Sequence, residues 1–406
     1  MKRFLLITIL VSVFLIALVG TVFGSDGVIK IGAAVSLSGK MAYEGTSVRD
    51  GYLVWEDWVN SHGGINAGGN NYQVKVIAYD DESNPVRAAK LTEKLITQDE
   101  VDFLFGPFSS SITFATTAIG EKYNKITMAP QSNASKIFER GYKNIFSVLP
   151  PAATLLEPVV HLAMDELEPK PEKVAIITAN DLFPLCCAEG LQKTCEELGL
   201  EVLFEKFPAG STDLSNLLSK VKSFNPDILA LTGYTSDSLM TMRQCKELNI
   251  NAKLYTFSEG VAIRAFVEEL GELSEYAFGA EWWIPQLKLE GPIFGTTANY
   301  VKAIKDKFGE DYKPSAQAAT GSAAASLLQL AIEKADSIET EKVREALSSL
   351  EVKLSTFAEI AFDDKGLNTK WVHPVVQIQN EKPVVVYPIA AQEASPIYPT
   401  PEWKER

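Results

Sequence analysis

The stretch Val101-Asp102-Phe103-Leu104-Phe105-Gly106-Pro107-Phe108-Ser109-Ser110-Ser111 decides the fold. A short apolar run that ends at Gly-Pro is typical of a buried strand that stops abruptly. The serines that follow can accept hydrogen bonds from free backbone N–H groups, which predicts a helix from Ser110 to Lys122. In open α/β sheets a helix start at the carboxyl end of a strand is where ligands bind, and it favours an anionic group. A plain helix cap without a ligand is the alternative.

The segments around this stretch alternate between strand and helix patterns. In the first 150 residues we predict strands over 28–35, 72–79 and 126–129, and helices over 46–62 and 86–98. The alternation restarts after Pro150-Pro151, with strands over 173–178, 201–207, 227–231 and 253–256 and helices over 186–199, 214–224 and 236–248. Such alternation predicts an α/β fold of two Rossmann-like lobes, each a mostly parallel sheet flanked by helices.

The last third of the chain departs from the alternation. Helices are predicted over 299–308 and 316–334, followed by turns at 362–366 and 379–382 that indicate an antiparallel end. We expect the chain to cross between the lobes three times and so form a three-stranded hinge. The first lobe would hold residues 25–148 and 279–355, and the second lobe residues 149–278 and 356–406.

The first 24 residues have the pattern of a targeting segment. Positive charge at Met1-Lys2-Arg3 precedes an apolar run from Phe4 to Val19, and small residues lead up to Gly24. This order is typical of a signal peptide cleaved before Ser25, which would place the mature protein in the periplasm or otherwise outside the cytoplasm. A retained membrane anchor is the alternative, because an apolar run of roughly 16 to 20 residues is nearly long enough to span a bilayer.

Charge and composition exclude several classes of function. The chain has 38 basic and 52 acidic residues, and this net charge of −14 argues against nucleic acid or an anionic membrane as a partner. Only three histidines occur, none near a nucleophile motif, and phosphate-loop and dinucleotide fingerprints are missing. We therefore expect no enzyme activity, no cofactor and no metal site.

Four cysteines, Cys186, Cys187, Cys195 and Cys245, leave several disulfide pairings open. In an oxidising compartment one or two bonds are possible. Because adjacent cysteines bond only with strain, we expect Cys186 or Cys187 to pair with Cys195 or Cys245. We expect no zinc site here, since the cysteine spacing fits no zinc finger.

Blocks along the whole mature chain resemble the type I periplasmic binding proteins. The blocks are Ile31 to Gly39, Gly63-Gly64-Ile65-Asn66, Tyr79-Asp80-Asp81, Phe105 to Ser110, Asp227 to Tyr234, and Phe257-Ser258-Glu259-Gly260. Their order is most similar to the leucine/isoleucine/valine-binding proteins of branched-chain amino-acid ABC importers. The resemblance implies a monomeric two-lobed receptor that closes on one small molecule and is then recognised by membrane permease subunits.

The resemblance also implies roles for individual residues. Ser110, with Ser109 beside it, falls on the serine that binds the ligand α-carboxylate, where the helix dipole adds roughly 0.3–1 kcal/mol. Glu259 falls on the carboxylate that pairs with the ligand α-ammonium. The remaining implied contacts are Gln131, Ser132 and Asn133 in a turn, Phe183 in place of a tyrosine, Tyr234, and Tyr43 with Glu44 near the ligand side chain.

Departures from the family pattern bear on the ligand. The late helix has Ala318 to Gly321 where the family has a bulky aromatic residue, which suggests a larger or differently shaped ligand side chain. Relatives bind amides, urea-like molecules or aromatic acids, and these stay open, as does a sensory ligand-binding module. Ser110 and Glu259 together favour a zwitterion, because a simple acid would leave Glu259 as an unpaired buried charge.

Overall fold

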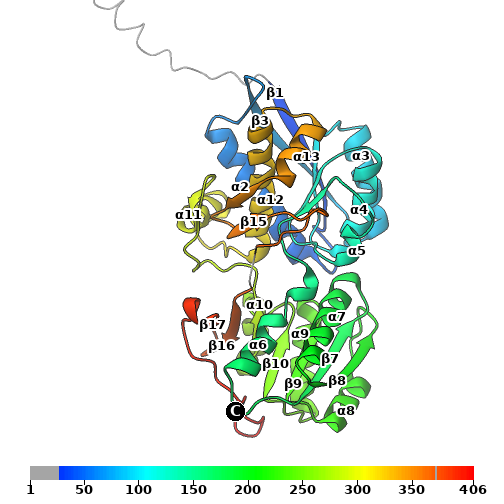
Figure 1. Ribbon diagram of the computed structural model, residues 1–406, viewed down its shortest axis with the longest axis vertical. Helices are drawn as coiled ribbons and strands as arrows, with labels where there is room; N and C mark the ends of the chain where they lie inside the picture. Colours follow the sequence, from blue (N-terminus) through cyan, green and yellow to red (C-terminus); the bar gives the residue numbers. More distant parts are fainter. Residues whose placement is uncertain (1–26, 371–372) are drawn as a thin grey trace, which may run out of the picture.

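Two α/β lobes lie one above the other in the computed structural model, which describes residues 27–370 and 373–406 (Figure 1). The predicted signal peptide lies outside the described residues. The upper lobe contains a six-stranded sheet in the order β2-β3-β1-β4-β5-β6. The strands are β1 (Gly27–Val35), β2 (Ile65–Ala67), β3 (Asn70–Asp80), β4 (Phe103–Phe105), β5 (Thr127–Ala129) and β6 (Ile145–Ser147). All pairings are parallel except that of β2 with β3.

The lower lobe contains a seven-stranded sheet in the order β17-β16-β11-β10-β9-β7-β8. Its strands are β7 (Lys173–Ala179), β8 (Glu201–Phe207), β9 (Ile228–Thr232), β10 (Leu254–Phe257), β11 (Phe278–Ala280), β16 (Val375–Ile378) and β17 (Pro383–Tyr387). The first five are parallel, and β16 and β17 add antiparallel at one edge. The predicted fold of two mostly parallel sheets is therefore confirmed.

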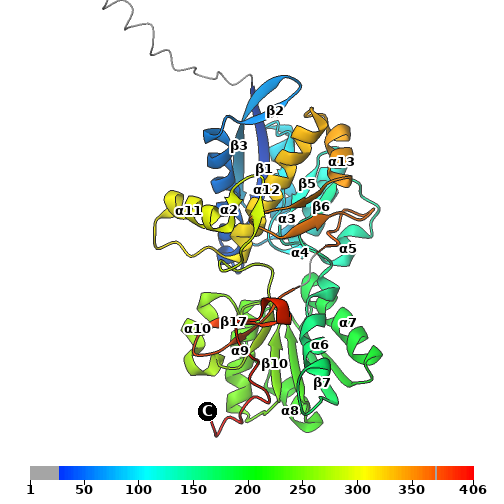
Figure 2. The same cartoon turned by 60° about the vertical axis from the view of Figure 1, so that its left-hand side comes forward.

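Helices flank both sheets (Figures 1 and 2). They are α2 (Ala42–Ser61), α3 (Pro85–Thr97), α4 (Ser110–Lys122), α5 (Ser135–Phe138), α6 (Glu157–Asp165), α7 (Leu182–Glu197), α8 (Ser215–Phe224), α9 (Thr235–Glu247), α10 (Arg264–Leu270), α11 (Thr297–Phe308), α12 (Ala316–Ala335) and α13 (Thr340–Ser348). Helix α4 has the predicted limits. Helix α7 begins four residues before the predicted start because the Asp181 side chain accepts a hydrogen bond from Leu182 N and caps it.

The small residues of α12 serve helix packing. A Cβ atom on Gly51 of α2 would lie 2.1 Å from the Ala318 carbonyl oxygen, and one on Gly321 would lie 2.5 Å from the Val48 carbonyl oxygen. The backbones of α2 and α12 therefore touch, which only small residues permit. Small residues at Ala318 and Gly321 are therefore required for this helix contact.

The third crossing between the lobes begins later than residue 356. Strands β14 (Glu351–Lys353) and β15 (Glu359–Ala361) pair with each other, and Leu367 forms a parallel bridge with Ser147 at the end of β6. Asn368 Nδ2 donates to the Val148 carbonyl oxygen at 2.9 Å. Residues 356–368 therefore stay with the first lobe, and the chain joins the second sheet only at β16.

All four cysteines are free thiols, so the expected disulfide is wrong. Cys186, Cys187 and Cys195 lie on one helix, where a separation of eight residues corresponds to about 12 Å, beyond the reach of a disulfide. Cys245 lies on α9, across the second sheet. Cys187 and Cys195 pack in the cluster that contains Val174 and Ile176 of β7, whereas Cys245 packs with Ala175 and Ile177 on the other face.

None of the helices within residues 27–370 and 373–406 combines the length and hydropathy that a membrane crossing needs.

Candidate functional site

The residues that the sequence nominates follow the carboxyl ends of parallel strands in both sheets. Ser109 and Ser110 come after β4, and Gln131 to Asn133 come after β5. In the second lobe, Phe183 follows β7, Tyr234 follows β9 and Glu259 follows β10. Because the carboxyl ends of parallel strands meet at one edge of a sheet, each lobe presents its nominated residues along one edge.

Ser109 and Ser110 place two buried hydroxyl groups at the start of α4. Ser109 is the N-cap residue, but its side chain makes no capping hydrogen bond, and Ser110 is only 2% exposed. The Ser110 hydroxyl has no hydrogen-bond partner, whereas the Ser109 hydroxyl interacts with the Tyr234 side chain. Since buried polar groups are nearly always satisfied, the unsatisfied Ser110 hydroxyl at a helix N-terminus marks a place where an acceptor could bind.

The turn after β5 is mostly committed to the first lobe. Ser132 Oγ donates toward the carbonyl oxygens of Pro107 at 3.1 Å and Phe108 at 3.0 Å, and Gln131 Nε2 donates to Thr320 Oγ1 at 2.6 Å. Asn133 Nδ2 donates to the Pro150 carbonyl oxygen at 2.6 Å, but its Oδ1 is buried without a partner. Gln131 and Ser132 therefore shape the turn, and Asn133 keeps one buried acceptor atom without a partner.

Aromatic rings meet where the lobes touch. The ring centroids of Phe183 and Tyr234 are 6.2 Å apart, and Phe108 of the first lobe lies 6.2 Å from Tyr234. The Tyr234 hydroxyl donates to Asp181 Oδ2 at 3.2 Å. Desolvation raises the pKa of Tyr234 well above its usual value, and the Asp181 charge adds to that effect. Tyr234 therefore stays neutral and can serve as a hydrogen-bond donor.

Glu259 is a buried carboxyl group, only 9% exposed, directly after β10. Desolvation raises its pKa well above the usual value, and the charges of Glu281 and Glu44 add to that effect. Within the described residues, no lysine, arginine or histidine forms an ion pair with Glu259. The charge of Glu259 also helps to raise the pKa of Tyr234, whereas the side-chain hydrogen bond with Ser109 lowers it.

Tyr43 and Glu44 lie in the first turn of α2, at the rim of the interface. Tyr43 is 50% exposed and lines two cavities, of about 340 Å³ and about 210 Å³. The larger cavity also contains Glu44 and Tyr234, and the smaller one contains Glu259. Thr235 Oγ1 of the second lobe donates to Glu44 Oε1 at 3.4 Å. Tyr43 is thus near the other nominated residues, although half of its surface faces solvent.

Sequence reasoning missed Asp181 and Glu281. Asp181 of the second lobe accepts a hydrogen bond from Ser111 Oγ at the start of α4, and it also caps α7. An aspartate before an apolar helical run is an N-cap signal, and that signal could have identified it. Glu281 follows β11 and lines the smaller cavity with Glu259. No local pattern distinguishes Glu281 from a surface glutamate.

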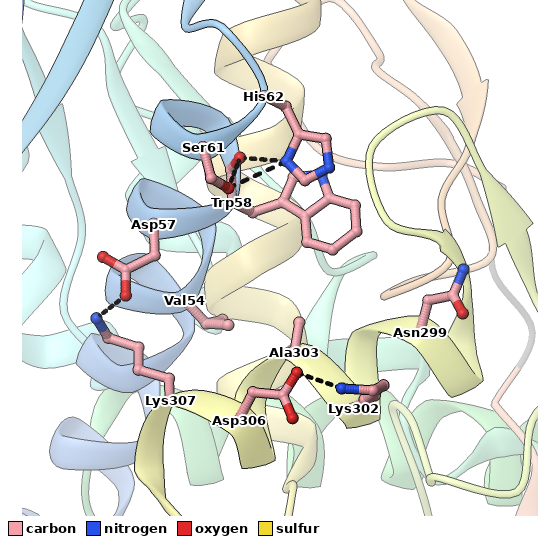
Figure 3. Close-up of a pocket in the computed structure, with 10 residues that line it drawn as sticks. All are labelled: Val54, Asp57, Trp58, Ser61, His62, Asn299, Lys302, Ala303, Asp306 and Lys307. Carbon is pink, nitrogen blue, oxygen red and sulfur yellow. Dashed lines mark hydrogen bonds and ion pairs between the residues drawn. The ribbon is translucent and has the colours of Figure 1, made fainter.

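A third cavity, of about 610 Å³, lies between α2 and α11 and contains none of the nominated residues (Figure 3). Its charged groups already have partners: Lys307 pairs with Asp57, and Lys302 with Asp306. His62 Nδ1 lies 2.7 Å from the Trp58 carbonyl oxygen. The partner-free atoms Ser110 Oγ and Asn133 Oδ1 instead follow the strand ends at the lobe interface, which makes the interface the stronger candidate for a ligand site.

Two α/β lobes with partner-free polar groups at their interface are the architecture of a two-lobed binding protein. The chain belongs to the periplasmic binding protein family, whose model matches residues 28–382. This is the type I family that the sequence blocks resemble.

Curated relatives extend over nearly the whole chain. The leucine-, isoleucine-, valine-, threonine- and alanine-binding protein of Pseudomonas aeruginosa is 28% identical over 340 residues, covering 83% of this chain and 86% of the relative. Leu/Ile/Val-binding protein homolog 7 of Brucella suis is 24% identical over 394 residues, covering 94% and 97%.

Solved structures share the fold at lower identity. A leucine-binding protein from Thermotoga maritima has a TM-score of 0.77 at 22% identity, covering 88% of this chain and 97% of that one. A solute-binding protein from Rhodopseudomonas palustris in complex with p-hydroxybenzoic acid has a TM-score of 0.76 at 16% identity, covering 93% and 99%. One fold therefore accommodates differently named ligands, so the site must decide the ligand.

Proposed function

We propose that this protein captures an amino acid between its two lobes and delivers it to the permease of an ABC importer. One observation supports the proposal most strongly: the partner-free Ser110 hydroxyl at the start of α4 in one lobe is matched by a carboxyl group without an ion-pair partner, Glu259, in the other lobe. A zwitterion carries the complementary charges. The Ser110 hydroxyl would donate to its carboxylate, and Glu259 would bind its ammonium group.

The ligand would stabilise the closed arrangement because it bridges the lobes. Closure desolvates both ends of the ligand, which strengthens each charge-assisted hydrogen bond. Phe183 and Tyr234 would then contact the apolar part of the ligand. The names of the curated relatives support a branched-chain or similar amino acid. Permease subunits would recognise the closed surface.

An aromatic acid is the second candidate. The cluster of Phe108, Phe183 and Tyr234 favours it, because aromatic side chains pack well against a flat apolar ligand. In this case the Ser110 hydroxyl would still bind a carboxylate, but Glu259 would need a proton to stay buried without a cation. The two candidates therefore differ in the role of Glu259.

Isothermal titration calorimetry with amino acids, benzoate and 4-hydroxybenzoate tests both candidate ligand classes. For an amino acid we expect Ser110→Ala to weaken binding about 5- to 100-fold, because a charged hydrogen bond is worth about 1–3 kcal/mol. Glu259→Gln should weaken it at least as much. Ser223→Ala is the matched control, since its exposed hydroxyl contacts only Ser219. If benzoate binds, no amino acid binds, and Glu259→Gln leaves the affinity for benzoate unchanged, the ligand is an aromatic acid and not an amino acid.

A further inference from the structure

A cavity of about 340 Å³ lies between the lobes, beside the pocket that contains Glu259. The first lobe contributes Tyr43 and Glu44 to its wall, and the second lobe contributes the start of α9 and Ile263. Tyr43 and Ile263 also line the pocket of Glu259, so the two cavities adjoin. The volume is in the range of small-molecule sites. A ligand held at Glu259 can therefore extend into this second space, which we call the side-chain cavity.

Glu44 places a buried carboxyl group in the wall of the side-chain cavity. The residue is only 8% exposed, in the first turn of α2. Its Oε1 accepts a hydrogen bond from Thr235 Oγ1 at 3.4 Å, which is long for a hydroxyl donor, and the carboxyl group also interacts with its own backbone N–H. Burial raises the pKa of Glu44, because desolvation disfavours the charged form. The carboxyl group therefore lacks the strong partners that a buried carboxylate needs.

The basic residues near the side-chain cavity do not neutralise Glu44. Lys40 lines the cavity but is exposed, and in the part of the chain that the structure describes no ion pair joins a basic side chain to Glu44. Glu269, which also lines the cavity, already pairs with Arg243 at 3.1 Å. A simple zwitterion brings only one positive charge, and Glu259 would use it. Glu44 would then stay buried without a counter-charge.

The remaining wall of the side-chain cavity suits a hydrocarbon chain. Both lobes contribute apolar side chains to it, namely Met41, Leu239, Ile263 and Ala265. Met41 and Leu239 are buried. Basic side chains combine a methylene stem, which packs on apolar surface, with a charged end. The apolar wall therefore matches the stem of such a side chain, and Glu44 matches its charged end.

We propose that the side-chain cavity binds a basic side chain of the ligand, whose cationic group pairs with Glu44, so that the ligand is a basic amino acid such as lysine, ornithine or arginine. A branched-chain side chain would instead place methyl groups against the buried carboxyl group and supply no donor. Glu44 is thereby assigned as the residue that determines specificity. The proposal rests on the proposed function and narrows its ligand to amino acids with a second positive charge.

Titration calorimetry with matched ligands tests whether the cavity requires a cation. L-Lysine, L-norleucine and Nε-acetyl-L-lysine share one hydrocarbon stem, but norleucine has no nitrogen at its end and acetyllysine has an uncharged amide there. We expect lysine to bind about 10- to 100-fold more tightly than either, because only lysine brings a positive charge to the buried carboxyl group. Norleucine or acetyllysine binding as tightly as lysine overturns the proposal.

Variants at position 44 then identify the residue. Glu44→Gln keeps the shape and removes the charge, so it should weaken lysine about tenfold or more and leave norleucine within about twofold. Glu44→Leu should reverse the order, so that norleucine binds more tightly than lysine. If Glu44 only held the lobes together through Thr235, both ligands would lose affinity equally, and the proposal would be wrong. Glu272→Gln, at an exposed glutamate, makes the same change in net charge and should leave both affinities unchanged.

The outcomes separate this proposal from the proposed function. If leucine, isoleucine or valine binds more tightly than lysine and Glu44→Gln does not change that affinity, the basic side chain is wrong and the amino-acid receptor stands. If no amino acid binds while benzoate or 4-hydroxybenzoate does, both fail. Should Glu44→Gln lower the melting temperature of the ligand-free protein, the comparison of lysine with norleucine and acetyllysine on the wild type still decides.

Discussion

Ser111 of the first lobe donates its hydroxyl hydrogen to the carboxylate of Asp181 in the second lobe. The same carboxylate accepts from Tyr234 and caps helix α7. The starts of α4 and α7 are thus joined across the interface by one side chain. A contact of this kind stabilises the closed arrangement even before a ligand contributes.

Replacing Asp181 should open the ligand-free protein. Asp181→Asn keeps an oxygen that can cap α7 but loses the charge and one acceptor, which should cost about 1 kcal/mol of closed-state stability. The closed-to-open ratio would fall about fivefold. Small-angle X-ray scattering should show a larger radius of gyration for the variant without ligand. Asp213→Asn, at an exposed aspartate bonded only to Ser215, should change nothing. An unchanged radius for Asp181→Asn would show that the contact does not control closure.

The local patterns predicted the fold well because they report on neighbouring residues. The Gly-Pro stop and the serines gave the limits of α4, and alternating strands and helices gave both sheets. Asp181 caps α7, so this helix begins at Leu182 and not at Cys186, where the sequence predicted its start. The need for small residues at Gly51 and Ala318 could not be predicted, because it arises from the contact of α2 with α12, which lie far apart in the sequence. Glu281 likewise matters only once the chain crosses between the lobes.

Cys186 should report on lobe closure. It is partly buried, and its sulfur lies 3.5 Å from Ser135 N of the first lobe. Cys187, Cys195 and Cys245 are buried, and desolvation raises the pKa of each thiol, so they should resist alkylation in the folded protein. Mass spectrometry after iodoacetamide treatment should find one modified site in the folded protein and four after unfolding. Ligand should slow the modification of Cys186, and modification at an unchanged rate would contradict closure over this residue.

Gly51→Ala should destabilise the first lobe although alanine is the better helix former. The added Cβ would lie 2.1 Å from the Ala318 carbonyl oxygen and 2.9 Å from Ser322 N, so α2 and α12 must move apart. We expect a loss of about 2–4 kcal/mol in the free energy of unfolding. Urea denaturation followed by circular dichroism measures it. Ser61→Ala, at the exposed end of the same helix, should stay within about 0.5 kcal/mol of the wild type. A Gly51→Ala variant as stable as the wild type would mean that the two backbones do not touch.

His373 should make the folded protein less stable in mild acid. It is 2% exposed and packs edge-on against Trp282, with ring centroids 4.5 Å apart. Desolvation lowers its pKa to about 3, from a usual value of 6.5. The unfolded chain therefore binds a proton between these values while the folded protein does not, so stability is lost as the pH falls below about 6.5. Between pH 7.5 and 5 the loss amounts to about 2 kcal/mol. Glu259 and Glu281, whose pKa values are raised, act in the opposite direction, because the folded state takes up their protons first.

Comparing urea unfolding of the wild type and His373→Gln at both pH values isolates the histidine, since the glutamates are common to both proteins. The variant should lose about 2 kcal/mol less on acidification, whereas His161→Gln, at an exposed histidine, should follow the wild type. Equal losses in His373→Gln and the wild type would mean that His373 is protonated without unfolding.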